Sequence, residues 1–156
     1  MRLVAPFEHA GAARTLVHLL KYRGVTSFAD LAAEALEPLV PRLPLVPVPR
    51  ALTRRIRYGV DPAGVLASAL ARRLDVPVEP LLVPHLHRSR RAGRDHGKAV
   101  SLFTVRPSQC PEVVLVDDVV TTGATMAAAI LSLGPERVRM AVAANTVSGV
   151  SRLSSP

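Results

Sequence analysis

Two kinds of hydrophobic pattern alternate along the chain. In some stretches apolar residues recur three or four positions apart, as in a helix that packs on one face, and in others they form short unbroken runs. Unbroken runs are typical of strands covered on both faces, so the alternation predicts an α/β protein with a parallel sheet flanked by helices. The expected helices are 9–22, 27–37, 61–74 and 123–133, and the expected strands are 45–49, 76–83, 102–105, 113–116 and 137–145.

Capping residues mark the limits of several helices. Ser27 is expected to cap the second helix, and Gly134–Pro135 to end the fourth. The third helix should begin at Asp61–Pro62, an N-cap followed by proline at the first helical position. The inward residues are expected to be Leu31, Ala35 and Leu36 in the second helix, and Leu66, Ala69, Leu70 and Leu74 in the third.

Strands 45–49 and 76–83 flank the third helix, which predicts a right-handed strand–helix–strand unit with parallel strands. The prolines in 45–49 have no N–H to donate, so this strand is expected at a sheet edge or leading directly into a loop. At 156 residues the chain is expected to be one domain. We divide it into a helical N-terminal region, an α/β core and a polar tail, at 1–43, 44–146 and 147–156.

Composition narrows the class of protein. Hydrophobic residues make up 49% of the chain but aromatic residues 3%, so the core is expected to be aliphatic. No apolar run reaches the ~20 residues that span a bilayer, and the first residues lack the apolar segment of a signal peptide. The single cysteine, Cys110, excludes an internal disulfide and a cysteine-based zinc site. These features predict a cytoplasmic protein without a membrane span.

The positive charge is concentrated in one part of the chain. The formal net charge is +8, and the segment 50–98 holds 11 basic and four acidic residues. Such a segment favours an anionic partner, either a phosphorylated metabolite or a nucleic acid. Within it, 85–99 has two glycines and few apolar residues, which predicts a loop or hairpin. Two interpretations of this loop stay open: a lid over a polyphosphate, or a disordered segment.

The most informative stretch is 113–126, where a buried strand precedes Asp117–Asp118, a loop rich in hydroxyl groups and the start of a helix. Carboxylates are costly to bury, so the pair is expected to face the crevice at the carboxyl ends of the strands. The loop Thr121–Thr125 would offer hydroxyls and unpaired N–H groups to a phosphate. Together these groups predict a site for ribose 5-phosphate. The alternative is a core strand followed by a polar turn.

This stretch resembles the phosphoribosyl-pyrophosphate motif of the type I phosphoribosyltransferases, in which two acids and a T-x-G-x-T loop follow a hydrophobic strand. Further pieces resemble the ComF family of that superfamily: Lys21–Gly24, Val46–Pro49 with Arg54–Gly59, and the helix ending at Leu74. The resemblance covers most of the chain. It implies a parallel five-stranded sheet flanked by helices, with a small N-terminal helical hood. The zinc-binding module with which many ComF proteins begin has no counterpart in this sequence.

The resemblance also implies a ligand, phosphoribosyl pyrophosphate (PRPP), and the residues that bind it. Asp117 and Asp118 would hold the ribose hydroxyls and, indirectly, Mg²⁺, and they are the candidate catalytic residues. The other implied contacts are Thr121, Thr122, Gly123, Ala124 and Thr125 for the 5-phosphate, Pro49, Arg50 and Ala51 for the pyrophosphate, and Arg94 and Lys98 in the lid.

Three hypotheses about function follow. The first is a transferase that moves phosphoribose from PRPP to an unidentified acceptor. Thr121 stands where related enzymes for 6-oxopurines have an aspartate base, which argues against hypoxanthine or guanine as that acceptor. The second is a non-catalytic ComF-type protein for DNA uptake that keeps the PRPP site as a sensor. The third is a protein that binds nucleic acid through the basic segment 50–98. A homodimer is left open.

Overall fold

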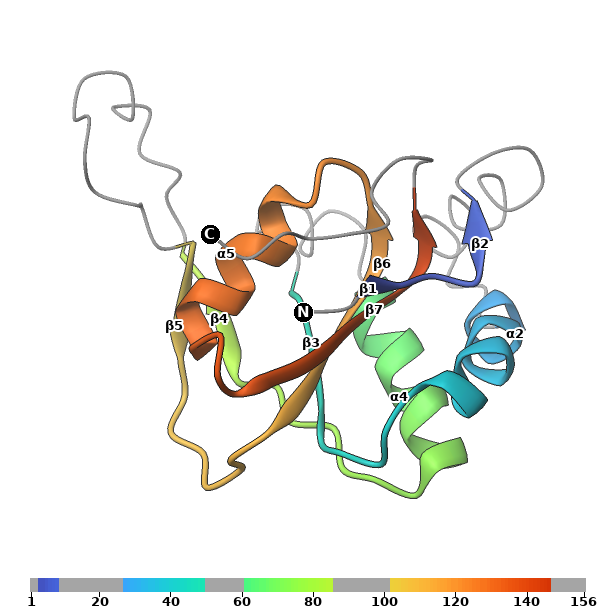
Figure 1. Ribbon diagram of the computed structural model, residues 1–156, viewed down its shortest axis with the longest axis horizontal. Coiled ribbons are helices and arrows are strands. Elements are labelled where there is room, and N and C mark those ends of the chain that lie inside the picture. The colour runs from blue at the N-terminus through green and yellow to red at the C-terminus, as the bar shows by residue number, and fades with distance from the viewer. Residues whose placement is uncertain (1–2, 9–26, 50–60, 86–101, 147–156) are drawn as a thin grey trace.

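The computed structural model describes residues 3–8, 27–49, 61–85 and 102–146. These residues form an α/β structure in which a parallel sheet is flanked by helices, as the hydrophobic pattern predicts (Figure 1). Within this part of the chain, none of the helices combines the length and the apolar character needed to cross a lipid bilayer. Four predicted features lie outside the described residues: the helix 9–22, the arginine-rich stretch 50–60, most of the loop 85–99 and the tail 147–156.

Two long strands form the centre of the sheet. β6 (Val113–Val120) and β7 (Val138–Thr146) are parallel neighbours. On one side β3 (Leu45–Pro47) pairs with β6, and on the other β1 (Leu3–Val4) pairs with β7, both in parallel. The resulting order, β1–β7–β6–β3, places the proline-containing β3 at one end, as its composition predicts.

A further short strand, β2 (Phe7–Glu8), continues the edge that β1 begins. β2 starts opposite Asn145 and β1 starts opposite Ala141, so both strands keep the same register on β7. Pro6 lies between them and has no N–H to donate to the ladder. The two strands therefore form one extended segment that a proline interrupts.

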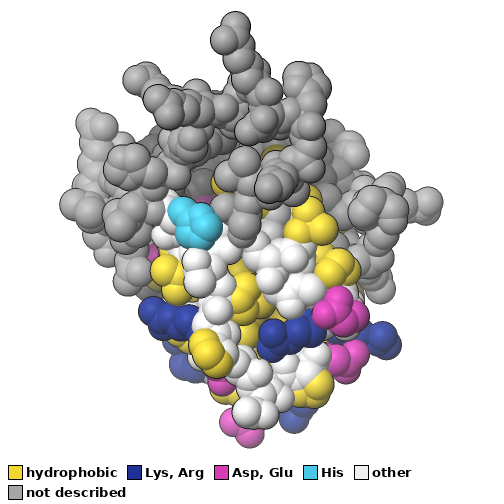
Figure 2. All heavy atoms as spheres, turned by 90° about the vertical axis from the view of Figure 1, so that its left-hand side faces the viewer, with side chains coloured by type: hydrophobic (Ala, Val, Ile, Leu, Met, Phe, Trp, Pro, Cys, Tyr) yellow, Lys and Arg dark blue, Asp and Glu magenta, His cyan; other side chains and the backbone are white. Residues whose placement is uncertain are grey.

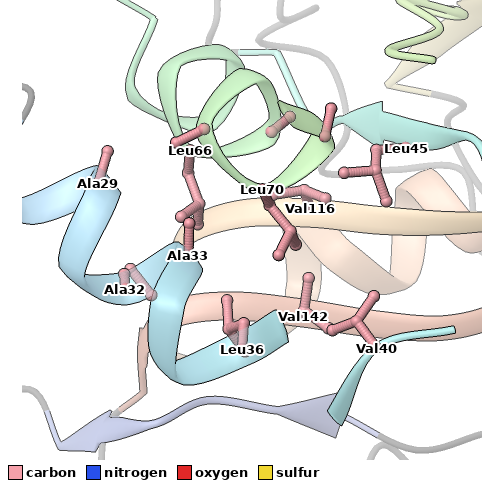
Figure 3. Close-up of a cluster of buried hydrophobic side chains, with 14 of the residues drawn as sticks. Ala29, Ala32, Ala33, Leu36, Val40, Leu45, Leu66, Leu70, Val116 and Val142 are labelled. Carbon is pink, nitrogen blue, oxygen red and sulfur yellow. The ribbon is translucent and has the colours of Figure 1, made fainter. Parts of the chain in front are cut away.

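One face of the sheet is covered by α2 (Ser27–Leu36), the short 3-10 helix η1 (Glu37–Leu39) and α4 (Pro62–Leu74) (Figure 1). Small alanines on α2 bring the helix close to the leucines of α4 and the valines of the sheet (Figure 3). Each fully buried leucine here contributes about 1.5–3 kcal/mol to folding. The fully covered members of this cluster include Ala32, Ala33, Leu36, Leu45, Leu66, Leu70, Val116 and Val142.

The opposite face is covered by α5 (Ala124–Leu133) (Figure 1). Next to it lies a two-stranded antiparallel sheet formed by β4 (Leu82–Pro84) and β5 (Phe103–Val105). A second apolar cluster joins these elements to the central sheet and includes Leu82, Phe103, Leu115, Met126 and Ala129. The structure thus has a separate core on each side of β6.

Helix α4 begins and ends where the sequence predicts. Asp61 is the N-cap in an extended conformation, and Pro62 follows as the first helical residue. The helix ends at Leu74, and Asp75 after it adopts a left-handed conformation, with its N–H bonded to the carbonyl of Ala71. All four residues predicted to face inward are buried.

The predicted inward face of α2 is partly wrong. Leu36 is buried, but Leu31 is 50% exposed and Ala35 is half-buried. The helical repeat places one stripe toward α4 and the sheet, and Leu31 falls beside it. Ser27 is the first helical residue of α2, so it does not take the predicted capping position, which precedes the helix. The stripe consists of Phe28, Ala29, Ala32, Ala33 and Leu36.

The predicted strand 76–83 is wrong as a single element. Val78 forms an isolated parallel bridge with Leu45, whose N–H donates to the carbonyl of Pro77 at 3.0 Å. Pro77 and Pro80 have no N–H groups, so the ladder does not extend over the stretch. The residues that follow form β4, which pairs with β5 and not with β3.

Gly134 ends α5, as predicted. Its N–H donates to the carbonyl of Ile130 at 3.0 Å, and its φ of 94° lies in a region that favours glycine. The chain then reaches β7, which begins and ends one residue later than the predicted strand 137–145.

Candidate functional site

Strand β6 is longer than the apolar run that predicts it. It covers Val113–Val120, so Asp117–Asp118 lie inside the strand and not after its end. The ladder with β7 continues past the acids, with Asp117 opposite Ala143 and Val119 opposite Asn145. The predicted end of the strand before the acids is therefore wrong. β7 offers backbone partners along the whole of β6, so the polarity of two side chains does not end it.

Both acidic residues are nearly covered by the rest of the chain. Asp117 is 8% exposed and Asp118 is 6% exposed. The backbone N–H of Asp118 donates a 2.7 Å hydrogen bond to Oδ1 of Asp117. A covered carboxylate needs such donors, because removing its charge from water is costly. The first acid is thus held against the backbone of the second.

The alternation of side chains along β6 changes at the acids. Val116 packs in the core under α2 and α4, and Leu115 packs in the core under α5. A regular strand would then place Val119 under α5 and Val120 under α2 and α4, but the structure has the reverse. One step between Val116 and Val119 therefore fails to change sides. The usual alternation of side chains between the two faces of a strand therefore does not determine toward which face Asp117 and Asp118 point.

The loop after β6 leads directly into α5. Thr121 and Thr122 are exposed, whereas Gly123 is buried and adopts a left-handed conformation with φ of 76°. Thr122 Oγ1 accepts a hydrogen bond from the N–H of Ala124 at 3.4 Å. The carbonyl of Gly123 accepts the first helical bond, from Ala127 at 2.8 Å. The structure thus brings a hydroxyl-bearing loop to a helix N-terminus, in the order that the motif predicts.

The first turn of α5 suits an anion. Ala124 and Thr125 are exposed, while Met126 points into the core and anchors the turn. The first N–H groups of a helix have no partner within it and lie at the positive end of its dipole. This first turn holds no acidic residue that would oppose a phosphate.

The carboxyl end of β3 lies at the same edge of the sheet as the acids. The N–H of Val48 donates to the carbonyl of Val116 at 2.8 Å, so the chain after β3 passes beside the residue that precedes Asp117. Pro49, which follows, is half-buried. The remaining predicted site residues, Arg50, Ala51, Arg94 and Lys98, lie outside the described part of the chain.

Asn145, at the carboxyl end of β7, is not among the residues that the motif selects. It is 0% exposed, and among the described residues neither its Nδ2 nor its Oδ1 has a hydrogen-bond partner. It lies opposite Val119, the residue after Asp118. The sequence does carry a signal for it, since this amide ends the otherwise apolar run Ala141–Ala144.

The acid pair supplies the candidate metal ligands. Within the described residues, no group of three or more His, Cys, Asp or Glu side chains is arranged to hold a metal ion. Two adjacent carboxylates do not make a closed site for zinc or calcium. They do fit Mg²⁺, which keeps several waters and takes one or two carboxylates together with substrate phosphates.

The surface around α5 bears on the nucleic-acid hypothesis. On the face in Figure 2, the described Lys and Arg side chains are separated from one another by uncharged and acidic side chains. A phosphate backbone is bound by basic groups that follow one another along a surface. The described part of this face does not offer such a stripe. Most basic residues of the segment 50–98 lie outside the described residues.

Comparisons of the chain with protein-family models, with curated proteins and with solved structures found no match. The motif of β6 and α5 and the geometry that surrounds it are therefore the features from which a function can be inferred.

Proposed function

We propose that this chain binds PRPP together with Mg²⁺ and transfers the phosphoribosyl group to an acceptor, as a ComF-like member of the type I phosphoribosyltransferase superfamily. One observation carries the proposal: β6 brings paired acids, an exposed hydroxyl loop and the N-terminus of α5 to one edge of a parallel sheet. Ligands in α/β sheets bind at this edge, outside the carboxyl ends of the strands. A covered carboxylate pair beside an anion site suits a sugar phosphate better than a free phosphate.

Each part of the site has a role in this proposal. The hydroxyls of Thr121, Thr122 and Thr125 and the N–H groups of the first turn of α5 bind the 5-phosphate. Asp117 and Asp118 accept hydrogen bonds from the ribose hydroxyls, which fixes the sugar ring over β6. Pro49 and the two residues after it bind the pyrophosphate.

The reaction is a displacement at the anomeric carbon. The bond from this carbon to the pyrophosphate oxygen breaks, and its electron pair leaves with pyrophosphate. A lone pair of the acceptor forms the new bond, and any proton on the attacking atom passes to the leaving pyrophosphate. The chain positions the two partners, excludes water and keeps negative charge beside the developing oxocarbenium ion.

Asp117 and Asp118 are the residues that would hold Mg²⁺ through its waters. When bound, the ion neutralises the pyrophosphate and makes it a better leaving group.

Calorimetric titration of the full chain with PRPP in the presence of Mg²⁺ tests the proposal. We expect Asp118→Asn to weaken binding by about tenfold to hundredfold, the loss for a hydrogen bond to a charged group. Glu112→Gln is the matched control, because Glu112 is an exposed acid next to the opposite end of β6. That variant should bind as the unchanged chain does. Equal affinity of all three proteins would overturn the site assignment.

Release of pyrophosphate separates the transferase from a protein that only binds PRPP. The transferase releases pyrophosphate when an acceptor is added, whereas a ComF-type sensor binds PRPP with the same dependence on Asp118 and releases none. A protein that binds only nucleic acid gives no heat with PRPP, and its affinity for DNA falls steeply with salt.

A further inference from the structure

The amide of Asn145 has no role in the proposed PRPP site. The side chain is 0% exposed and, within the described residues, its donor and its acceptor are both unpaired. Buried polar groups are nearly always hydrogen-bonded, and leaving one unpaired destabilises a fold. The four residues before it are apolar and buried, so an apolar side chain would suit this strand better. A polar group kept in such a place is typical of a functional position.

Asn145 lies near Asp117 and Asp118 in the sheet. Asn145 lies opposite Val119 in the ladder between β6 and β7, one residue beyond Asp118. The strand order places β3 on one side of β6 and β7 on the other. The carboxyl ends of all three strands therefore lie in a row, with Pro49 at one end, the acids in the centre and Asn145 at the other end.

This row matches the geometry of a displacement at a sugar carbon. The attacking group reaches the anomeric carbon from the side opposite to the leaving group. If pyrophosphate lies over the end of β3 and ribose over β6, the acceptor lies over the end of β7. We propose that Asn145 binds the acceptor, an inference that rests on the proposed function.

The chemistry of the side chain limits the acceptor. An amide offers one acceptor oxygen and two N–H donors on neighbouring atoms and carries no charge. Its natural partner is a neutral group with an adjacent donor and acceptor, such as the edge of a nitrogen heterocycle or a carboxamide. A carboxylate or an ammonium group would satisfy half of the amide and leave the other half unpaired. Since no part of Asn145 meets solvent in the free chain, the acceptor enters when the site opens locally.

The first measurement is the thermal stability of the ligand-free chain. Asn145→Leu keeps the size of the side chain and removes both unpaired groups, so we expect the melting temperature to rise by about 2–4 °C. Thr146→Val is the matched control, because the hydroxyl of Thr146 donates to the carbonyl of Val120 at 3.3 Å. Removing that paired hydroxyl should lower the melting temperature. A drop for Asn145→Leu as well would overturn the inference.

The second measurement compares ribose 5-phosphate with UMP, AMP and nicotinamide mononucleotide by calorimetry. The three nucleotides add to the same sugar phosphate a base that has an adjacent donor and acceptor. We expect at least one nucleotide to bind the unchanged chain about tenfold more tightly than ribose 5-phosphate does. The Asn145→Leu variant should bind that nucleotide no more tightly than ribose 5-phosphate, and its affinity for ribose 5-phosphate should be unchanged.

The outcomes separate this inference from the proposed function. If ribose 5-phosphate and PRPP both fail to bind, the proposed function is wrong and the inference is wrong with it. If they bind but no nucleotide gains from its base, or if Asn145→Leu keeps the gain, the inference alone is wrong.

Discussion

The backbone N–H of Asp118 donates a 2.7 Å hydrogen bond to Oδ1 of Asp117, the residue before it. The hydrogen bond ties the side chain of one acid to the peptide group of the next, inside a strand that continues on both sides. Asp117 therefore has two tasks in the proposed site. In the proposal its carboxylate binds the ligand, and in the structure the same carboxylate holds the backbone that carries the second carboxylate.

The structural task of Asp117 can be separated from its charge. Asp117→Asn and Asp117→Leu both remove the charge at similar size, but only the asparagine keeps an oxygen that accepts from the Asp118 N–H. We expect the asparagine variant to be more stable than the leucine variant by about 1–3 kcal/mol, the cost of an unpaired buried donor. Urea unfolding of both variants gives this difference. Equal free energies of unfolding would mean that the hydrogen bond does not support the strand.

A second prediction concerns the glycine of the proposed phosphate loop. Gly123 has φ of 76°, so Gly123→Ala should cost about 1–2 kcal/mol, because a β-carbon is unfavourable in the left-handed region. The same variant should weaken binding of ribose 5-phosphate, since the loop leads into the N-terminus of α5. Unfolding in urea and calorimetry measure the two effects.

Gly64→Ala is the control for that substitution. A β-carbon at Gly64 would meet atoms of Asp61 at 3.7–3.9 Å, which is ordinary contact, and the position is helical. Alanine should therefore stabilise the chain by about 0.4–1 kcal/mol and leave binding unchanged. A stability loss at Gly64 equal to that at Gly123 would show that the left-handed backbone is not the cause.

The local signals in the sequence were sufficient for α4 and for the loop before α5. Asp61 and Pro62 start a helix through their own backbone preferences, and Gly123 permits a turn that other residues resist. These effects act within a few residues, so they can be read from the chain alone. The same holds for Gly134 at the end of α5.

The features that the sequence did not predict depend on distant partners. β6 continues through Asp117–Asp118 because β7 lies beside it, and 76–83 breaks up because its prolines interrupt a ladder with β3. Leu31 is exposed because α4 packs on the alanine stripe of α2. Asn145 differs from an ordinary strand residue because, among the described residues, both of its polar atoms are buried and unpaired, which the sequence alone does not show.

A third prediction compares the core and the surface of the contact between α2 and α4. Leu70 is 0% exposed in the core under these helices, so Leu70→Ala should cost about 2–5 kcal/mol. Arg72 pairs with Asp30 at 3.0 Å, but these side chains are 68% and 56% exposed. A double-mutant cycle on that pair should give a coupling of less than about 1 kcal/mol. Comparable values in urea unfolding would mean that the ion pair contributes to the contact between α2 and α4 as much as the apolar core does.

The last prediction concerns removal of Mg²⁺. Asp117 and Asp118 place two covered carboxylates beside the proposed binding region of a polyanion, and like charges in a poorly solvated site repel strongly. Chelation of divalent ions with EDTA should therefore weaken PRPP binding by about tenfold or more, while ribose 5-phosphate, which lacks the pyrophosphate, binds almost as before. Calorimetry with each ligand, with and without EDTA, measures both changes. If EDTA weakens both ligands equally, the ion acts on the fold or on the 5-phosphate and not between the acids and the pyrophosphate. If it weakens neither, the assignment of Mg²⁺ to the acid pair is wrong.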